Sequence, residues 1–367
     1  GYVAINAGLQ QGSTELQVTD ASGFAQGQGA EIRQQDIVPP SADWGALAVG
    51  QMVRIVGIQG NTLTIEPPLH LDYDVGKSPE IRPIDFVEGV GIEDLHLRRI
   101  DAGGSSANNI GFRRVARAWV RRVESDFTEK YHLGIGESLQ LEIRDSYFHH
   151  AKSKGDGGQG YGVSLGRYVT SVLVENNIFV ETRHAMIVQI GVNGCVFGYN
   201  YAEKNYSDDG WDKTFITLHG HYPYMNLFEG NIVGYVGVDD VWGPSGPKNT
   251  FFRNKVLGTD KHQDFGDFRG ILLEAYHGTQ YLIGNQVAGE GIYGDLSGAV
   301  LHGNEVNGDV TWDPSLPRPL PPSYYRVTRP PFYGTLHWPS IGTGQPWTLS
   351  TNPALLRWQA AAPVPQP

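Results

Sequence analysis

The stretch that decides the fold is Phe228-Glu-Gly-Asn231-Ile-Val, because the same phrase recurs along the chain. An apolar residue is followed by two variable residues, an Asn and then an apolar pair. Close copies are Val174-Glu-Asn-Asn177-Ile-Phe, Phe197-Gly-Tyr-Asn200-Tyr-Ala and Phe252-Arg-Asn254-Lys-Val, and looser copies surround Ser125, Ser146, Asn285 and Asn304. Successive anchors lie 21, 31, 23, 31, 23, 31 and 19 residues apart. A period of this size indicates a stacked repeat.

Each repeat contains two or three short apolar runs separated by Gly, Asn and Asp, and none has a sustained helical pattern. Coils built only from short strands and turns are typical of a parallel β-helix, an all-β solenoid. Asn tolerates the left-handed backbone conformation, and stacked amides can hydrogen-bond along the axis. The alternative is an ordinary β-sandwich with Asn at its turns, which the alternation of 23 and 31 residues disfavours.

Composition divides the chain into three parts. Residues 1–88 contain separate β-rich stretches, and we expect a subdomain that caps the first coil. Residues 89–312 carry the repeats. Residues 313–367 are rich in Pro and aromatic residues, and Pro is excluded from central strands. We expect this last part to be an extended strap whose aromatic side chains pack on the solenoid, although they could instead bind sugar rings.

Charge and hydropathy exclude some functions. The formal net charge of −11 argues against a nucleic-acid partner, and no apolar run is long enough to span a membrane. The one cysteine, Cys195, can form no internal disulfide and is expected to be buried. The chain begins at Gly1 without an initiator Met, so we expect a secreted, extracellular or periplasmic protein whose signal peptide has been removed.

Ionisable residues follow the anchors by about four to ten positions in five consecutive coils. The 31-residue coils carry their additional length in the same region, in residues 152–160, 206–214 and 260–270. Equivalent positions of a solenoid stack at about 4.8 Å along one face, so we expect a groove walled by these loops. The candidates for catalysis are Lys152, Arg183, His184, Asp209, His219, Asp240 and Glu274.

Aromatic and polar side chains in the same segments are suited to binding a sugar chain. The candidates for substrate binding are Lys154, Tyr161, Gln189, Trp211, His221, Tyr224 and Trp242. No cofactor is required by these residues. Ca²⁺ is conceivable at Asp208 and Asp239, because carboxylate oxygens are its usual ligands. An Arg-rich stretch, residues 98–122, could bind a polyanion, but pairing with neighbouring Glu and Asp residues is the simpler interpretation.

The chain resembles the right-handed parallel β-helix superfamily of pectate lyases, polygalacturonases and related secreted bacterial proteins. The resemblance covers about residues 85–310 and includes Gly157-Gly-Gln-Gly-Tyr-Gly162 and Glu181-Thr-Arg-His-Ala185. Lys152-Ser153 and Arg183-His184 are similar to the Lys-Ser and Arg-His motifs of an alginate-lyase family, with different spacing. The spaced Asp pattern of polygalacturonases is not reproduced. The resemblance implies a right-handed solenoid that acts on a polysaccharide.

Three functions remain open. A polysaccharide lyase that performs β-elimination needs a cation for the uronate carboxylate and a base for the adjacent proton, roles suited to Arg183 with His184 and to Lys152 or His219. An inverting glycoside hydrolase needs two carboxyl groups about 6.5–9.5 Å apart, such as Asp240 with Asp209 or Glu274. A glycan-binding module needs neither set. We favour the lyase slightly, and an epimerase would share its proton abstraction.

Overall fold

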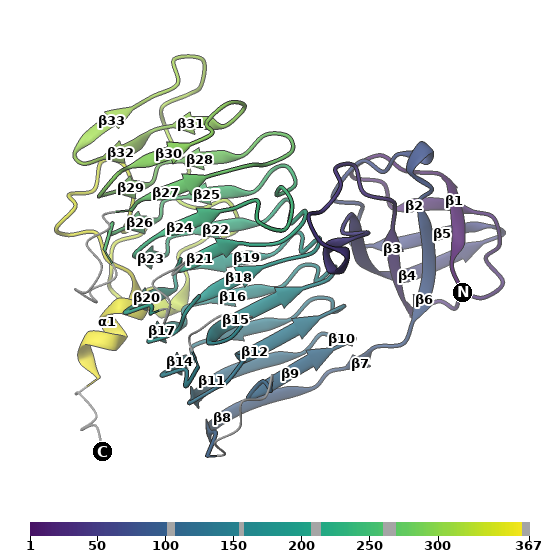
Figure 1. Ribbon diagram of the computed structural model, residues 1–367, viewed down its shortest axis with the longest axis horizontal. Coiled ribbons are helices and arrows are strands. Elements are labelled where there is room, and N and C mark those ends of the chain that lie inside the picture. Colours follow the sequence, from purple (N-terminus) through teal and green to yellow (C-terminus); the bar gives the residue numbers. More distant parts are fainter. Residues whose placement is uncertain (101–106, 154–157, 207–213, 260–268, 362–367) are drawn as a thin grey trace.

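The computed structural model describes residues 1–100, 107–153, 158–206, 214–259 and 269–361. Figure 1 shows a β-barrel beside a tall stack of strands. The barrel is antiparallel and closes in the order β1-β2-β5-β4-β3-β6. Its strands are β1 (Val3–Ala7), β2 (Glu15–Val18), β3 (Gly29–Arg33), β4 (Gly50–Gln59), β5 (Thr62–Glu66) and β6 (Glu80–Ile84). Alternating residues of these strands fill the interior of the barrel, as Leu16, Val18, Leu63 and Ile65 show with exposures of 3% or less.

The stack is a right-handed parallel β-helix, as the sequence predicts. One strand of every coil joins an eight-stranded parallel sheet, here called sheet 1. Its strands are β9 (Ile110–Arg113), β12 (Tyr131–Gly136), β15 (Tyr161–Gly166), β18 (Met186–Val188), β21 (Ile216–Leu218), β24 (Val236–Val238), β27 (Ile271–Leu273) and β30 (Ile292–Gly294). A short pair, β7 (Val87–Glu88) with β10 (Val115–Ala116), lies where the chain enters the stack.

The opposite wall, sheet 2, takes one long strand from each of the first coils and two short strands from each later coil. The long strands are β8 (Gly91–Arg98) and β11 (Trp119–Asp126). The short ones are β13 (Glu142–Arg144), β14 (Tyr147–His149), β16 (Leu173–Glu175), β17 (Ile178–Val180), β19 (Val196–Gly198), β20 (Tyr201–Glu203), β22 (Leu227–Glu229), β23 (Ile232–Val233), β25 (Thr250–Phe252), β26 (Lys255–Val256), β28 (Tyr281–Ile283), β29 (Gln286–Val287), β31 (Val300–His302), β32 (Asn304–Val306) and the antiparallel β33 (Asp309–Thr311).

The recurring Asn forms a hydrogen-bonded ladder at the turn between the two short strands. Asn200 Nδ2 donates to Asn231 Oδ1 at 3.0 Å, and Asn231 Nδ2 donates to Asn254 Oδ1 at 2.9 Å. The ladder continues through Asn285 to Asn304. The left-handed conformation belongs to the residue before each Asn, for example Tyr199 and Gly230, and not to the Asn itself. Amide stacking, rather than the backbone conformation of the Asn itself, therefore explains why Asn recurs at this turn.

The first anchor proposed from the sequence, Ser125, is wrong. Val123 N donates to Ser146 Oγ at 3.1 Å, so Val123 occupies the equivalent position of the preceding coil. Ser125 pairs in register with Phe148 and lies two residues further along. The interval from Val123 to Ser146 is 23 residues, which restores the alternation of 23 and 31.

A second ladder lies five residues before the first. Asn226 Nδ2 donates to Asn249 Oδ1 at 3.0 Å, and Asn249 Nδ2 donates to Gln280 Oε1 at 3.1 Å. Cys195 occupies the same position one coil earlier, where its Sγ lies 3.4 Å from Val172 N. Burial raises the pKa of the Cys195 thiol to about 12. Cys195 therefore completes a ladder as well as filling the core.

The barrel packs against the side of the stack rather than over its first coil, which differs from the position expected from the sequence. Met52 N donates to Thr170 Oγ1 at 3.0 Å, and His70 Nδ1 lies 2.7 Å from Asn193 Oδ1. Met52 and Ile84 also pack on Ala116. These contacts follow the turn that leads from sheet 1 into sheet 2. The barrel therefore borders one edge of sheet 1.

The Pro-rich C-terminal segment lies along the outside of sheet 2, and its helix lies on the far side of the stack from the barrel in Figure 1. Arg326 Nη2 lies 2.6 Å from Glu175 Oε2, and Lys255 Nζ donates to Trp347 O at 2.7 Å. The segment ends in α1 (Pro353–Ala360), which begins because Asn352 Oδ1 caps Leu355 N at 2.9 Å. Among the described residues, none of the helices has the length and hydropathy needed to cross a membrane.

Candidate active site

Four of the predicted site residues, Gln189, His219, Asp239 and Glu274, lie in one row on the outer face of sheet 1. Two positions of each strand point into the core, as Met186 with Val188 and Ile216 with Leu218 show. The residue after the second of these core positions therefore points outward. The register of sheet 1 aligns these residues in consecutive coils. This outer row is Gly166, Gln189, His219, Asp239 and Glu274.

The centre of the row is a bonded pair of side chains. His219 Nδ1 lies 2.7 Å from Asp239 Oδ2, and Trp242 Nε1 donates to His219 Nε2 at 2.9 Å. An indole N–H can only donate, so Nε2 carries a lone pair and the proton is on Nδ1. Asp239 Oδ1 accepts a hydrogen bond from Val241 N at 3.2 Å. This arrangement fixes the tautomer and the orientation of the imidazole.

Aromatic rings continue from this pair across the face of the sheet. The ring centre of His184 lies 6.2 Å from that of His219 and 4.8 Å from that of Tyr161. The Tyr161 ring in turn stacks on Tyr131, with 5.2 Å between the ring centres. On the other side, the ring centre of Trp242 lies 6.3 Å from that of His219 and 5.3 Å from that of Trp44 in the barrel. Trp44 is 39% exposed and Trp242 is partly exposed, so these two indoles present accessible aromatic surface to a ligand.

His184 and Tyr161 are buried among protein groups. His184 is fully buried, and its Nδ1 lies 2.9 Å from Thr214 O and 3.2 Å from Thr217 Oγ1. Tyr161 is 3% exposed. Neither ring offers the open face that the sequence analysis assigns to Tyr161 as a sugar-binding residue. Their contacts support the row from beneath.

The predicted cationic residues lie in the segments that lead from sheet 2 into sheet 1, on the edge away from the barrel. Arg183 is 8% exposed, and its backbone N donates to Gly160 O at 2.7 Å. Lys152 is exposed, and its backbone N donates to Thr128 O at 2.8 Å. At the other edge, Asp240 and Glu274 are exposed next to Asp239 and Gln189 is partly exposed. The structure thus distributes the predicted residues over both edges of sheet 1.

Two predicted substrate-binding residues lie instead beneath the barrel. Tyr224 is fully buried and donates its hydroxyl to Gly50 O at 2.9 Å. His221 is also fully buried, and its Nε2 lies 3.7 Å from Asp36 Oδ1. Burial lowers the pKa of His221, although Asp36 opposes that shift. Both side chains hold the barrel against the solenoid.

Four predicted residues, Lys154, Asp208, Asp209 and Trp211, lie outside the described residues. The proposed Ca²⁺ site at Asp208 and Asp239 therefore remains a prediction, with Asp239 engaged by His219 and Val241. The sequence analysis missed Trp44 and Asp36, because the barrel's docking position has no local sequence signal. It also gave no role to His149 and His150, which belong with Asp126 to a cluster of possible metal ligands.

Comparisons with known proteins place the fold. No protein-family model and no curated protein matches the sequence. The tailspike protein gp49 from Pseudomonas phage LKA1 matches over 79% of this chain and 47% of its own, with 14% identity and a TM-score of 0.51. The tailspike gp61 of Pseudomonas phage phi297 matches over 85% and 60%, with 11% identity and a TM-score of 0.44.

The Gp54 tailspike of Acinetobacter baumannii bacteriophage AP22, solved in complex with a capsular saccharide, matches over 82% of this chain and 64% of its own, with 8% identity and a TM-score of 0.33. The chain thus spans less than two thirds of the length of each of these tailspikes. At these sequence identities the similarity concerns the fold alone. Of these three tailspikes, gp49 is the one with a TM-score above 0.5. The chain shares the right-handed parallel β-helix architecture with that phage tailspike.

Proposed function

We propose that this chain is a secreted enzyme that cleaves a polysaccharide bound across the outer face of sheet 1, by β-elimination next to a uronate carboxylate. The observation that carries the proposal is the His219–Asp239 pair at 2.7 Å, with Trp242 on the other imidazole nitrogen. A base oriented by a carboxylate is the arrangement that proton abstraction requires. A structural surface pair needs no such orientation.

The reaction assigns one role to each group. When substrate displaces the indole N–H, His219 Nε2 accepts the proton α to the uronate carboxylate. The electrons of that C–H bond form a C4=C5 double bond, the C4–O bond breaks, and the leaving oxygen takes up a proton from water. Asp239 stabilises the imidazolium formed in this step. The imidazolium later returns its proton to water. Arg183 and Lys152 are the proposed cations for the uronate, and Trp242 and Trp44 provide surfaces on which sugar rings can stack.

A hydrolase is the second candidate, because Asp239 and Glu274 occupy the same row in adjacent coils and Asp240 lies beside them. Mass spectrometry of the products from a panel of uronate and neutral polysaccharides separates the two reactions. Oligosaccharides one water lighter than the hydrolytic series support β-elimination, and their absence together with hydrolytic products contradicts it. Binding of a glycan without any product would instead indicate a non-catalytic module.

A further inference from the structure

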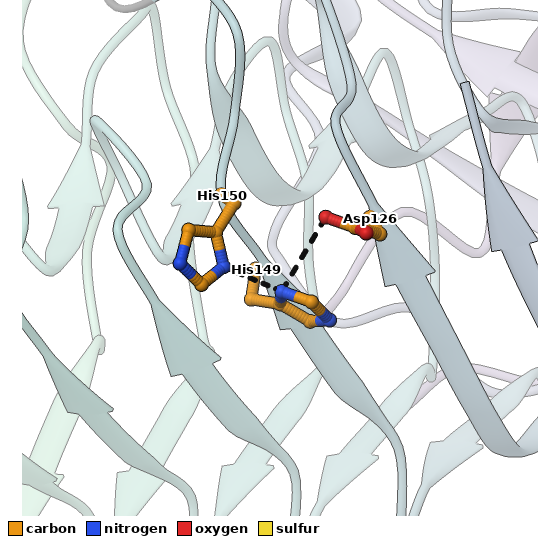
Figure 2. A group of neighbouring side chains, drawn as sticks. All are labelled: Asp126, His149 and His150. Atoms are coloured by element: carbon orange, nitrogen blue, oxygen red, sulfur yellow. Dashed lines mark hydrogen bonds and ion pairs between the residues drawn. The ribbon is translucent and has the colours of Figure 1, made fainter. Parts of the chain in front are cut away.

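A compact group of possible metal ligands lies at the ends of two neighbouring strands of sheet 2. Asp126 ends β11 and His149 ends β14, and the two residues pair in register. His150 follows directly. One ligand atom from each of the three residues lies within 4.8 Å of the others. Figure 2 shows the three side chains turned toward a common point.

Both imidazoles present the same nitrogen to this point. The Nδ1 atoms of His149 and His150 are 2.6 Å apart, and Asp126 Oδ1 lies 3.5 Å from His149 Nδ1. Ligand atoms around a tetrahedral Zn²⁺ are separated by about 3.4 Å, given Zn–N bonds of about 2.1 Å. The separation of Asp126 Oδ1 and His149 Nδ1 matches this value. The two Nδ1 atoms share a hydrogen bond in the metal-free chain, and they would have to move apart by about 0.8 Å to bind one ion.

The far nitrogen of each imidazole faces a carboxylate. His149 Nε2 lies 3.1 Å from Glu124 Oε1, and His150 Nε2 lies 3.6 Å from Glu181 Oε2. A proton on Nε2 leaves the Nδ1 lone pair available for a metal. Carboxylates in this position are the usual outer partners of metal-bound histidines, because they fix the tautomer and raise the basicity of the ring.

The carboxylate of Asp126 gives the independent indication of a ligand. The residue is 5% exposed, and within the described part of the chain its Oδ1 makes no hydrogen bond. A buried carboxylate oxygen without a hydrogen bond is costly. The other oxygen, Oδ2, faces Arg98 at 3.7 Å and His96 at 3.8 Å, both nearly half exposed. Arg98 and His96 thus approach Oδ2, whereas Oδ1 is the carboxylate oxygen nearest to His149 Nδ1.

We propose that Asp126, His149 and His150 bind one Zn²⁺ ion through Oδ1 and the two Nδ1 atoms. Two imidazoles and one carboxylate favour a transition metal over Ca²⁺ or Mg²⁺, which prefer oxygen ligands. His150 is partly exposed, with 28% of its side chain accessible, which gives the ion a route from solvent. The bound ion would fix the chain that follows β14 to the end of β11, and the proposal does not depend on the reaction at His219.

Calorimetric titration of the metal-free chain with ZnCl₂ tests this site. We expect one ion per chain, and binding weakened by about 100-fold or more in D126N and H150Q. E124Q removes only an outer partner and should weaken binding by about 10- to 100-fold. H96Q is the matched control, because His96 lies near the same carboxylates but outside the cluster. Circular dichroism of each metal-free variant establishes that it is folded.

Several results would overturn the proposal. They are the absence of stoichiometric binding to the wild-type chain, wild-type affinity in both D126N and H150Q, an equal loss in H96Q, or Ca²⁺ binding as tight as that of Zn²⁺. A Zn²⁺-dependent rise in melting temperature that is lost in H150Q supports it, because an ion that binds the folded chain stabilises it by mass action.

Discussion

The two sheets of the solenoid use polar residues on their outer faces in opposite ways. On sheet 2, the fully buried Glu175 receives hydrogen bonds from Tyr325 and Arg326, and Lys255 donates to carbonyl groups of the C-terminal segment. Burial raises the pKa of Glu229 and lowers that of Lys255. On sheet 1, His219 and Asp239 bond to each other, and Trp242 donates to the second nitrogen of His219. The polar groups of sheet 2, which the C-terminal segment covers, hold the fold together. The oriented pair on the outer face of sheet 1 is instead suited to catalysis.

The strongest test of this comparison is His219→Ala. Loss of an oriented base should lower kcat/KM by about 10²–10⁴-fold while leaving the melting temperature nearly unchanged. His337→Ala is the matched control, because His337 is an exposed histidine of the C-terminal segment. Full activity of His219→Ala on a substrate that the wild-type chain cleaves would show that the outer face of sheet 1 does not use His219 as a base.

On sheet 2, Arg326→Ala should reduce stability and leave turnover by the remaining folded chain unchanged. It removes the main partner of Glu175, which is fully buried, and a buried charge without its partner costs about 3–5 kcal/mol. Urea unfolding measures the loss, with the exposed Arg329→Ala as control. Equal stabilities of the two variants would show that the C-terminal segment contributes little to the solenoid.

The Asn ladder is expected to be the next most sensitive feature. Asn231 donates to Phe197 O and Asn254 Oδ1 and accepts from Asn200 N and Nδ2. Asn231→Ala leaves several of these buried groups without a partner, so the free energy of unfolding should fall by about 2–4 kcal/mol. Asn307→Ala, at an exposed Asn with one hydrogen bond to Gly289 O, serves as the reference in the same denaturation series.

The smallest effect concerns pH and the barrel interface. Burial lowers the pKa of His70 and of His221 below the usual 6.5. The unfolded chain then binds more protons than the folded chain, so the stability that these groups contribute is present above pH 6.5 and lost as the pH falls below it. Melting curves between pH 7.5 and 5 should show a smaller acid-induced decrease in His70→Gln than in the wild-type chain. An unchanged decrease would assign the pH dependence to other groups.

The sequence predicts the solenoid well because its signals are local and repeated. Asn177, Asn200, Asn231 and Asn254 each report the same turn, so an error at Ser125 does not change the architecture. The outer row was identified only in part. Gln189, His219 and Glu274 follow from offsets. The contact between His219 and Asp239 was not predicted, because it joins two coils and depends on their register.

The barrel interface could not be predicted, since it depends on long-range docking. Tyr224 and His221 look like groove residues in the sequence, yet each contacts the barrel, at Gly50 and near Asp36. The helix α1 was equally hidden, because a short segment among many Pro residues becomes helical only where Asn352 both caps it and bonds to Asn200 O and Gly230 O. Tertiary contacts decide such elements.

The two ladders have a consequence for how this chain can change in evolution. In the coils that carry both ladders their positions are five apart, as from Cys195 to Asn200 and from Asn226 to Asn231, so an insertion between them would shift one ladder against the other. The stretch that returns from one ladder to the other through sheet 1 is 18 residues long from Asn177 to Cys195 but 26 from Asn200 to Asn226. This returning stretch, part of which borders the proposed active site, can therefore vary in length without changing the spacing of the two ladders.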